Sequence, residues 1–198
     1  MLKKILIRGF FILLALYAML VIYRAFVLYG EDRTEEHVAK IHATKLSQGD
    51  VMGKNLPPLP SNPDATVAGV DANKNGIRDD VELAIFKAYP NSAKTRAVLL
   101  QYALAFQMEV LQPRINAGTV GAIANEQDRA FFCSAEIIEN AAGEDAVILA
   151  VEKFGKFAQE LQFNTEERRA AHKEFYSHLK SGTTGESHCD IDLKSLPN

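Results

Sequence analysis

The chain opens with an unbroken apolar run from Gly9 to Tyr23. Fifteen helical residues span about 23 Å, which is short of the roughly 30 Å hydrocarbon core of a bilayer. If the helix continues past Arg24 to residue 29, it spans about 31 Å, and the Arg24 side chain can reach the headgroups. The pattern therefore predicts a transmembrane signal-anchor over residues 9–29, which would place this segment in the lipid bilayer.

Two alternatives compete with the anchor: a cleaved signal peptide and a buried helix of a soluble protein. A cleaved peptide needs small residues before its cleavage point, and the exit RAFVLYGED has no A-x-A pattern. Three basic side chains lie within residues 1–8, whereas Glu31 and Asp32 open the segment after the span. Because positive charge stays inside, we expect a cytoplasmic N-terminus, a single pass through the inner membrane, and residues 31–198 exported to the periplasm.

A second helical pattern follows the anchor. Within residues 30–52, Thr34 can cap a helix and Gly49 can end it. The apolar stripe of this helix is narrow, so we expect a stalk or a docked helix. Residues 53–70 hold four of the seven prolines, which predicts an extended linker with polyproline II character. The LPPLP motif inside it fits a spacer better than a ligand for a proline-recognising domain.

Helical periodicity continues to the end of the chain, and no stretch alternates like a strand with hairpin signals. Residues 93–112 are apolar nearly all round, but Gln101, Gln107 and Glu109 interrupt them, so we expect a central buried helix. The predicted fold is all-α, with a compact bundle of about five helices in residues 83–198. The expected helices cover residues 80–89, 93–112, 121–141, 144–163 and 165–180, and the stretch NAGTVG is expected to be a loop.

Charge is distributed unevenly along the chain. Residues 1–30 carry four basic side chains and no acidic one, so the remaining 18 basic side chains face 25 acidic ones, a net charge of −7. Nucleic-acid binding needs a basic footprint. This composition excludes nucleic acid as a partner.

Cys133 and Cys189 are the only cysteines. On the exported side, two cysteines are typical of one disulfide. Closing a loop of about 57 residues would stabilise the fold by about 4 kcal/mol in the chain-entropy model, and would tether the polar tail SGTTGESHCDIDL. The alternatives are two buried thiols, a redox pair, for which no C-x-x-C spacing is present, and a zinc site that includes His188.

The stretch VDANKNGIRDDVE, residues 70–82, places side-chain oxygens at alternate positions just before an expected helix. Calcium (Ca2+) takes six to eight oxygen ligands, and a twelve-residue loop supplies them at positions 1, 3, 5, 7, 9 and 12. Gly76 stands at position 6, where such a loop turns sharply. The series matches D-x-[DN]-x-[DN]-G-x₅-E. Its ligand positions hold Asp71, Asn73, Asn75, Ile77, Asp79 and Glu82.

This stretch resembles EF-hand and dockerin-like calcium loops over about twelve residues, and it also resembles the NGIRDDVE loop of bacterial envelope proteins. The resemblance implies that Ile77 offers its carbonyl oxygen, that Asp79 binds directly or through water, and that Glu82 binds with both oxygens. Two features depart from the EF-hand: Arg78 stands where an aliphatic residue is usual, and a proline-rich segment replaces the entering helix. We therefore expect a single structural site of about 10⁻⁴–10⁻³ M affinity. The alternative is a polar turn in which Asp79 only caps the helix.

Catalytic motifs are absent from the sequence: no H-E-x-x-H, G-x-S-x-G, P-loop or G-x-G-x-x-G occurs. We therefore expect a membrane-anchored exported protein that binds calcium structurally and serves as an interaction or scaffold module with an envelope protein as partner. One alternative is an envelope enzyme, hydrolase-like, that uses calcium to hold its substrate, which predicts a cleft beside residues 71–82. The other is a metal-free helical adaptor.

Overall fold

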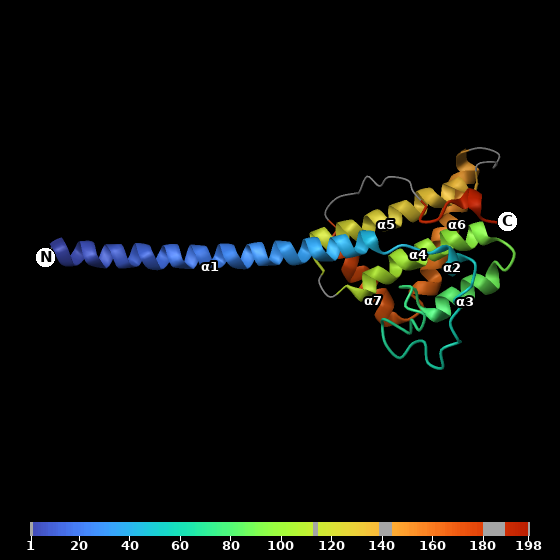
Figure 1. The fold of residues 1–198 in the computed structure, drawn as a ribbon, viewed down its shortest axis with the longest axis horizontal. Coiled ribbons are helices and arrows are strands. Elements are labelled where there is room, and N and C mark those ends of the chain that lie inside the picture. Colours follow the sequence, from blue (N-terminus) through green and yellow to red (C-terminus); the bar gives the residue numbers. More distant parts are fainter. Residues whose placement is uncertain (1, 113–114, 139–143, 180–188, 198) are drawn as a thin grey trace.

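The computed structural model describes residues 2–112, 115–138, 144–179 and 189–197, and in these ranges the chain is helical, with no strand. A single long helix, α1 (Leu2–Ala43), runs into a compact bundle at its C-terminal end (Figure 1). The predicted all-α class and the bundle of about five helices are confirmed. The remaining elements are α2 (Gln48–Val51), α3 (Asp79–Ala88), α4 (Ala93–Leu111), α5 (Ala117–Glu136), α6 (Glu144–Gln162), α7 (Glu166–Ser177) and the 3-10 turn η1 (Leu193–Ser195).

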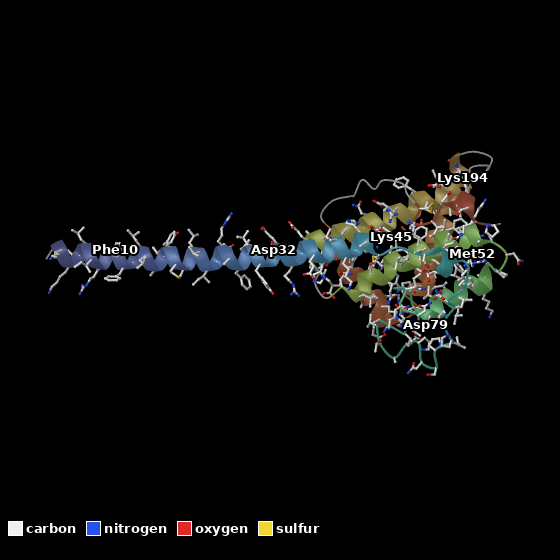
Figure 2. All side chains as sticks on the ribbon, viewed as in Figure 1. Phe10, Asp32, Lys45, Met52, Asp79 and Lys194 are labelled. Carbon is white, nitrogen blue, oxygen red and sulfur yellow. A yellow bond between two sulfur atoms is a disulfide. The ribbon has the colours of Figure 1, made fainter. Side chains whose placement is uncertain are left out.

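Helix α1 combines the predicted anchor and the predicted stalk. The helix from Lys3 to Ala43 is long and apolar enough to cross a membrane, and the apolar side chains around Phe10 are exposed on the part of the helix that extends beyond the bundle (Figure 2). The prediction that Thr34 caps a separate helix is wrong: Thr34 lies inside α1, and its hydroxyl donates to the Gly30 carbonyl at 3.0 Å. Neither proline nor a competing cap interrupts the helix between the two segments, so it continues to Ala43.

The predicted end of the stalk near Gly49 is also wrong, because α1 ends at Ala43 and a new helix, α2, begins at Gln48 with Ser47 as its N-cap. Ser47 Oγ accepts from the Asp50 amide at 3.2 Å, and Asp50 Oδ2 accepts from the Ser47 amide at 2.8 Å. This reciprocal capping box fixes the start of α2.

The C-terminal end of α1 docks on α5 through a buried carboxylate. Glu126 accepts hydrogen bonds from His42 at 2.7 Å and from Lys45 at 2.6 Å. Burial favours a higher pKa for Glu126, but the bonds from Lys45 and His42 and the charge of Lys45 bring that pKa below its ordinary value. The stalk is therefore a docked helix over its last turns.

Helix α4 lies at the centre of the bundle and packs against α2, α3, α5, α6 and α7. The prediction of a central buried helix is confirmed, since nearly every residue from Ala93 to Glu109 is buried. Two of its buried polar side chains form hydrogen bonds with other segments of the chain. Gln101 accepts from the Asp190 amide at 3.0 Å, and Gln107 donates to the Ala68 carbonyl at 2.8 Å.

Helix α5 begins four residues before the predicted start, inside the stretch NAGTVG. Asn116 Oδ1 accepts from the amides of Gly118 at 2.9 Å and Thr119 at 3.1 Å, and Thr119 Oγ1 accepts from the Asn116 amide at 3.1 Å. This cap makes the predicted loop a helix start. The helix ends at Glu136, and residues 139–141 of the predicted helix lie outside the described residues. The other four bundle helices begin within one residue of their predicted starts.

Cys133 and Cys189 form a disulfide, with a Cα–Cα distance of 4.9 Å, which confirms the predicted pair. The bond joins α5 to the C-terminal segment. The next residue, Asp190, accepts from the Leu46 amide at 3.1 Å and from Arg129 at 2.9 Å. The tail from residue 189 onward is thus packed against the end of α1, whereas residues 181–188 of the predicted tail lie outside the described residues.

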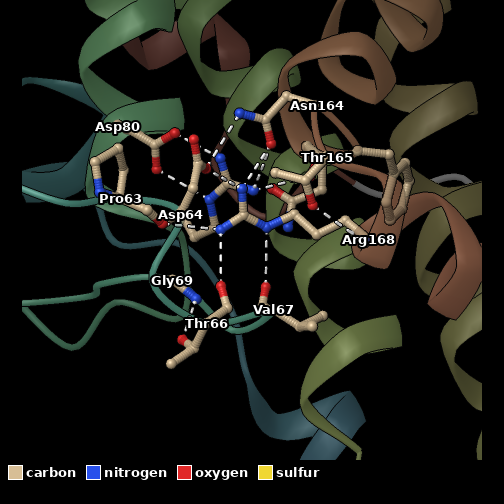
Figure 3. A network of polar contacts seen from close by, with 12 residues as sticks. Pro63, Asp64, Thr66, Val67, Gly69, Asp80, Asn164, Thr165 and Arg168 are labelled. Carbon is tan, nitrogen blue, oxygen red and sulfur yellow. Dashed lines mark hydrogen bonds and ion pairs between the residues drawn. The ribbon is translucent and has the colours of Figure 1, made fainter.

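The proline-rich segment forms neither helix nor strand and contains turns and bends between residues 61 and 68, and it is not a free spacer. The guanidinium of Arg168 in α7 is fully buried and donates to the carbonyls of Pro63 at 2.9 Å, Thr66 at 3.1 Å and Val67 at 3.0 Å (Figure 3). It also bonds to Asp64 at 2.5 Å, and this hydrogen bond lowers the pKa of Asp64. Arg168 therefore clamps the linker onto the bundle just before the candidate metal loop.

Candidate metal-binding loop and adjacent cavity

The loop of residues 71–82 connects the clamped linker to α3 and folds back on itself. Lys74 and Gly76 have φ angles of 59° and 86°, both left-handed. The backbone angle at Gly76 favours glycine, and a Cβ there would stand 2.8 Å from Leu104 Cδ1, so the end of that side chain would have to shift. Asp71 accepts from the Asn75 amide at 3.2 Å and from the Gly76 amide at 2.9 Å, which holds the curl closed.

The side chains at other candidate ligand positions also accept hydrogen bonds from backbone amides of this loop. Asn73 Oδ1 accepts from the Asn75 amide at 3.3 Å, and Asn75 Oδ1 accepts from the Ile77 amide at 2.9 Å. Asp79 Oδ1 accepts from the Ala72 amide at 3.0 Å. These bonds fold the alternating side chains onto the amides of their own loop.

Two carboxylates at the start of α3 are buried without full hydrogen bonding. Glu82 is 0% exposed and Asp79 is 1% exposed. Within the described part of the chain, Glu82 Oε1 and Asp79 Oδ2 have no hydrogen-bond partner. A buried, unpaired carboxylate oxygen is costly and calls for either a proton or a cation.

The pKa values of both carboxylates are raised, as expected for buried groups that require a proton or a cation. Burial raises the pKa of Glu82 to about 7, the amides of Asn73 and Asn75 oppose the shift, and the charges of Asp50 and Asp79 add to it. Burial likewise raises the pKa of Asp79, with the charges of Asp71 and Asp80 adding to it. A divalent cation would favour the ionised form of both groups.

The donor set suits a hard cation, since it consists of oxygens. No group of three or more His, Cys, Asp or Glu side chains stands together to hold a metal in the described ranges. The set in this loop instead relies on two asparagines and the Ile77 carbonyl. The Asn73 amide NH₂ now donates to Glu82 Oε2 at 3.0 Å and to the Asn55 carbonyl at 3.0 Å. To bind an ion, Asn73 would have to offer its oxygen in place of this NH₂ group.

Arg78, at the position that departs from the EF-hand pattern, has a structural role that the sequence did not reveal. Its side chain is 0% exposed. It pairs with Asp80 at 2.5 Å and donates to the Gln162 carbonyl at 2.9 Å. Arg78 therefore attaches the loop to the end of α6, where an EF-hand would pair with a second loop.

Asp50 is a further acidic residue of the site, outside the predicted ligand series. It belongs to the α2 capping box, is 8% exposed, and its charge raises the pKa of Glu82. The spacing Ser47-x-x-Asp50 was the available signal for its capping role.

A cavity of about 660 Å³ opens beside the loop, between the C-terminal ends of α1 and α4. Its apolar lining includes Ile41, Leu104 and Met108, and three candidate ligand residues of the loop face it. The loop residues are Asp71, Asn73 and Asn75, and the basic lining residues are His37, Lys40, Lys45 and Lys74. A cleft in this position is the feature that the enzyme alternative predicted.

A second polar cluster lies in the bundle, and no sequence motif indicates it. Glu109 of α4 is 2% exposed and lies 2.6 Å from His172 Nδ1 of α7. Gln127 of α5 donates to Glu109 at 2.5 Å and accepts from the Tyr176 hydroxyl at 2.5 Å. The cluster joins three helices, and aromatic rings of Phe106, Phe163 and Tyr176 surround the imidazole.

Comparison with known proteins gave no match: no family model, curated protein or solved structure is significantly similar to this chain. Its function must therefore be inferred from its own residues.

Proposed function

We propose that residues 71–82 bind calcium and that the chain is a membrane-anchored, exported helical protein of the cell envelope. The observation that carries the proposal is the pair of buried, unpartnered oxygens, Glu82 Oε1 and Asp79 Oδ2, among the described residues at the end of a complete ligand series. The ligands are Asp71, Asn73, Asn75, Ile77, Asp79 and Glu82.

The ion has a structural role in this proposal. Its ligands come from both sides of the curl, so binding joins the clamped linker to the first turn of α3. Arg78 already attaches the same curl to α6. With this fixed attachment in the place of a partner loop, calcium stabilises one conformation and does not switch between two.

The cellular placement rests on the N-terminal half of α1 and on the cysteines. The apolar helix, the basic side chains before it and the acidic side chains after it support an N-terminus in the cytoplasm and residues 31–198 in the periplasm. The disulfide suits an oxidising compartment. The partners in this proposal are the lipid bilayer, through residues 9–29, and a further envelope protein for which the chain acts as an interaction or scaffold module.

Calorimetric titration and thermal unfolding of the full chain in detergent test the metal. Calcium is expected to release or take up heat and to stabilise the fold by about 1.4 kcal/mol at ten times the dissociation constant. Glu82→Gln and Asp71→Asn should abolish both effects, whereas Glu160→Gln, which neutralises an exposed carboxylate on α6, should leave them intact. Absence of heat and of stabilisation at millimolar calcium would leave the metal-free adaptor as the better description.

The cavity favours a second candidate, an envelope enzyme in which the ion holds a substrate. Because Asp71 and Asn73 line both the loop and the cavity, a substrate there would share the ion with them. Calcium-dependent hydrolysis of ester or phosphoester substrates that Asp71→Asn abolishes would replace the scaffold role with this one.

A further inference from the structure

The cavity beside the loop has an apolar wall formed by two helices. Ile41 of α1 and Leu104 and Met108 of α4 line it and are 3%, 3% and 7% exposed. Leu111 stands at the rim and is 45% exposed. A volume of about 660 Å³ lies within the range of roughly 300–1,000 Å³ that is usual for small-ligand sites.

Some basic side chains that line the cavity have an ion-pair partner in the described part of the chain and others do not. Among the described residues, the ammonium groups of Lys40 and Lys74 have no hydrogen-bond or ion-pair partner, whereas Lys45 pairs with Glu126 at 2.6 Å. The two acidic residues of the lining are already engaged. Asp50 accepts from Ser47, and Asp71 accepts from the amides of its own loop. These neutral donors leave both carboxylates charged but hold them on Ser47 and on the loop, so the ammonium groups of Lys40 and Lys74 are the charged groups open to the anionic end of a ligand.

The position of Lys40 shows which source of anions can reach it. Lys40 lies eleven residues beyond Tyr29, the last residue of the predicted span, which is about 17 Å along a continuous helix. Charges separated by more than the Debye length of about 8 Å are largely screened. Headgroups of the bilayer that holds α1 therefore lie outside the reach of Lys40. This step rests on the membrane placement proposed above.

The cavity is poorly suited to binding a peptide. The described residues contain no strand whose edge could pair with a main chain. An apolar wall beside two unpaired cations instead suits a small molecule with one anionic end and one aliphatic chain.

We infer that this cavity binds a free, single-chain amphipathic anion, with its carboxylate or phosphate against Lys40 and Lys74 and its aliphatic chain along Ile41, Leu104 and Met108. Fatty acids and monoalkyl phosphates both have such an anionic head and a single aliphatic chain. The apolar wall and the two cations act together, so neither the head alone nor the chain alone binds well.

The absence of tryptophan from the chain permits a specific optical test. Leu111→Trp places a single tryptophan at the rim of the cavity in the full chain, reconstituted in phosphatidylcholine vesicles in metal-free buffer. Octanoate and octyl phosphate are expected to change its emission saturably. Acetate, inorganic phosphate and octanol are expected to produce little change at equal concentration. Because no calcium is present, the outcome is independent of the metal proposal.

Variants of the two lysines then test whether their charges bind the anionic end of the ligand. Lys40→Gln with Lys74→Gln in the reporter chain should weaken octanoate binding by about tenfold or more, which corresponds to about 1.4 kcal/mol, because both ammonium groups that would contact its carboxylate are removed. Lys156→Gln, an exposed lysine of α6 with 74% of its side chain accessible, should leave binding unchanged. In the chain without the tryptophan, octanoate should raise the unfolding temperature, which keeps the test valid if Leu111→Trp fails to fold.

Four results would overturn the inference. They are equal binding of octanol, equal binding of acetate or phosphate, an emission change that only tracks partition into the bilayer, and an emission change caused by phosphatidylglycerol in the vesicles without added amphiphile. The last result would assign the cavity to the headgroups of the surrounding membrane.

Discussion

Arg78 Nη1 donates to the backbone carbonyl of Gln162 at 2.9 Å, so the candidate metal loop is attached to the last residue of α6. The two residues are 84 positions apart in the chain. This hydrogen bond holds the loop of residues 71–82 against the bundle without a bound ion. It gives the loop a fixed orientation relative to α3 and α6, and it makes Arg78 the first residue to test.

Replacing Arg78 by Met is expected to lower the free energy of unfolding by about 3 kcal/mol, because it leaves the carboxylate of Asp80 and a buried carbonyl without their partner. Urea denaturation of the full chain measures the change. Arg169→Met is the control, because Arg169 is exposed and its guanidinium donates to the Phe163 carbonyl at 3.2 Å. Equal effects of the two variants would show that the buried position of Arg78 is unimportant.

Loss of the Arg168 clamp should release the linker. In Arg168→Gln the carbonyls of Pro63, Thr66 and Val67 lose their shared donor, so the backbone near these residues should open more often. Limited proteolysis is expected to cut the variant between residues 56 and 70 at least about tenfold faster, which corresponds to roughly 1.4 kcal/mol of local stability. Unchanged cleavage there would mean that the prolines alone hold the segment.

The buried Glu109 predicts a pH dependence. Burial raises its pKa above the ordinary 4.5, and the hydrogen bonds from His172 and Gln127 and the charge of His172 oppose the rise. Because the folded-state pKa is the higher one, the stability that Glu109 contributes is fully present below pH 4.5 and is lost as the pH rises through the folded-state value. The nearby Tyr176 has its pKa raised to about 12, so it stays neutral in this range.

Glu109→Gln removes the titrating group and keeps a hydrogen-bonding amide. The stability of the unchanged chain relative to this variant should therefore fall as the pH rises above 4.5. Denaturation curves at a series of pH values measure the difference. A difference that grows with pH would show that the ionised Glu109 and a protonated His172 stabilise the fold as an ion pair.

Removal of the disulfide should destabilise the bundle and loosen the tail. Cys133→Ala with Cys189→Ala is expected to lower the free energy of unfolding by about 2–5 kcal/mol. Hydrogen exchange should rise at the amide of Leu46, which donates to Asp190 at 3.1 Å. Unchanged exchange at Leu46 would show that the ion pair of Asp190 with Arg129 holds the tail without the disulfide.

The sequence predicted the helices well because their apolar periodicity is a local property. Its errors are also local, and concern caps. The sequence predicts a loop where Asn116 caps α5, and it predicts a cap at Thr34, which lies inside α1. An Asn or Thr has the same composition signal in both settings, so only the three-dimensional contacts distinguish them.

The candidate ligand series was visible because all of its residues lie within twelve positions. The structure places them in one curl, and calcium binding itself stays a prediction. The clamp by Arg168, the attachment by Arg78 and the pair of Glu109 with His172 join residues 63 to 105 positions apart. Such pairs depend on how helices pack, and a single sequence carries no periodic signal for them.

The continuity of α1 limits how a partner can approach. The bundle contacts α1 at Thr34, whose hydroxyl accepts a hydrogen bond from the side-chain Nδ2 of Asn116 at 3.0 Å. Thr34 is five residues beyond Tyr29, a rise of about 8 Å along the helix. If α1 spans the membrane as proposed, the gap beneath the bundle is narrower than a second domain. The proposed envelope partner would then dock on the flanks of the bundle or on the face that points away from the bilayer.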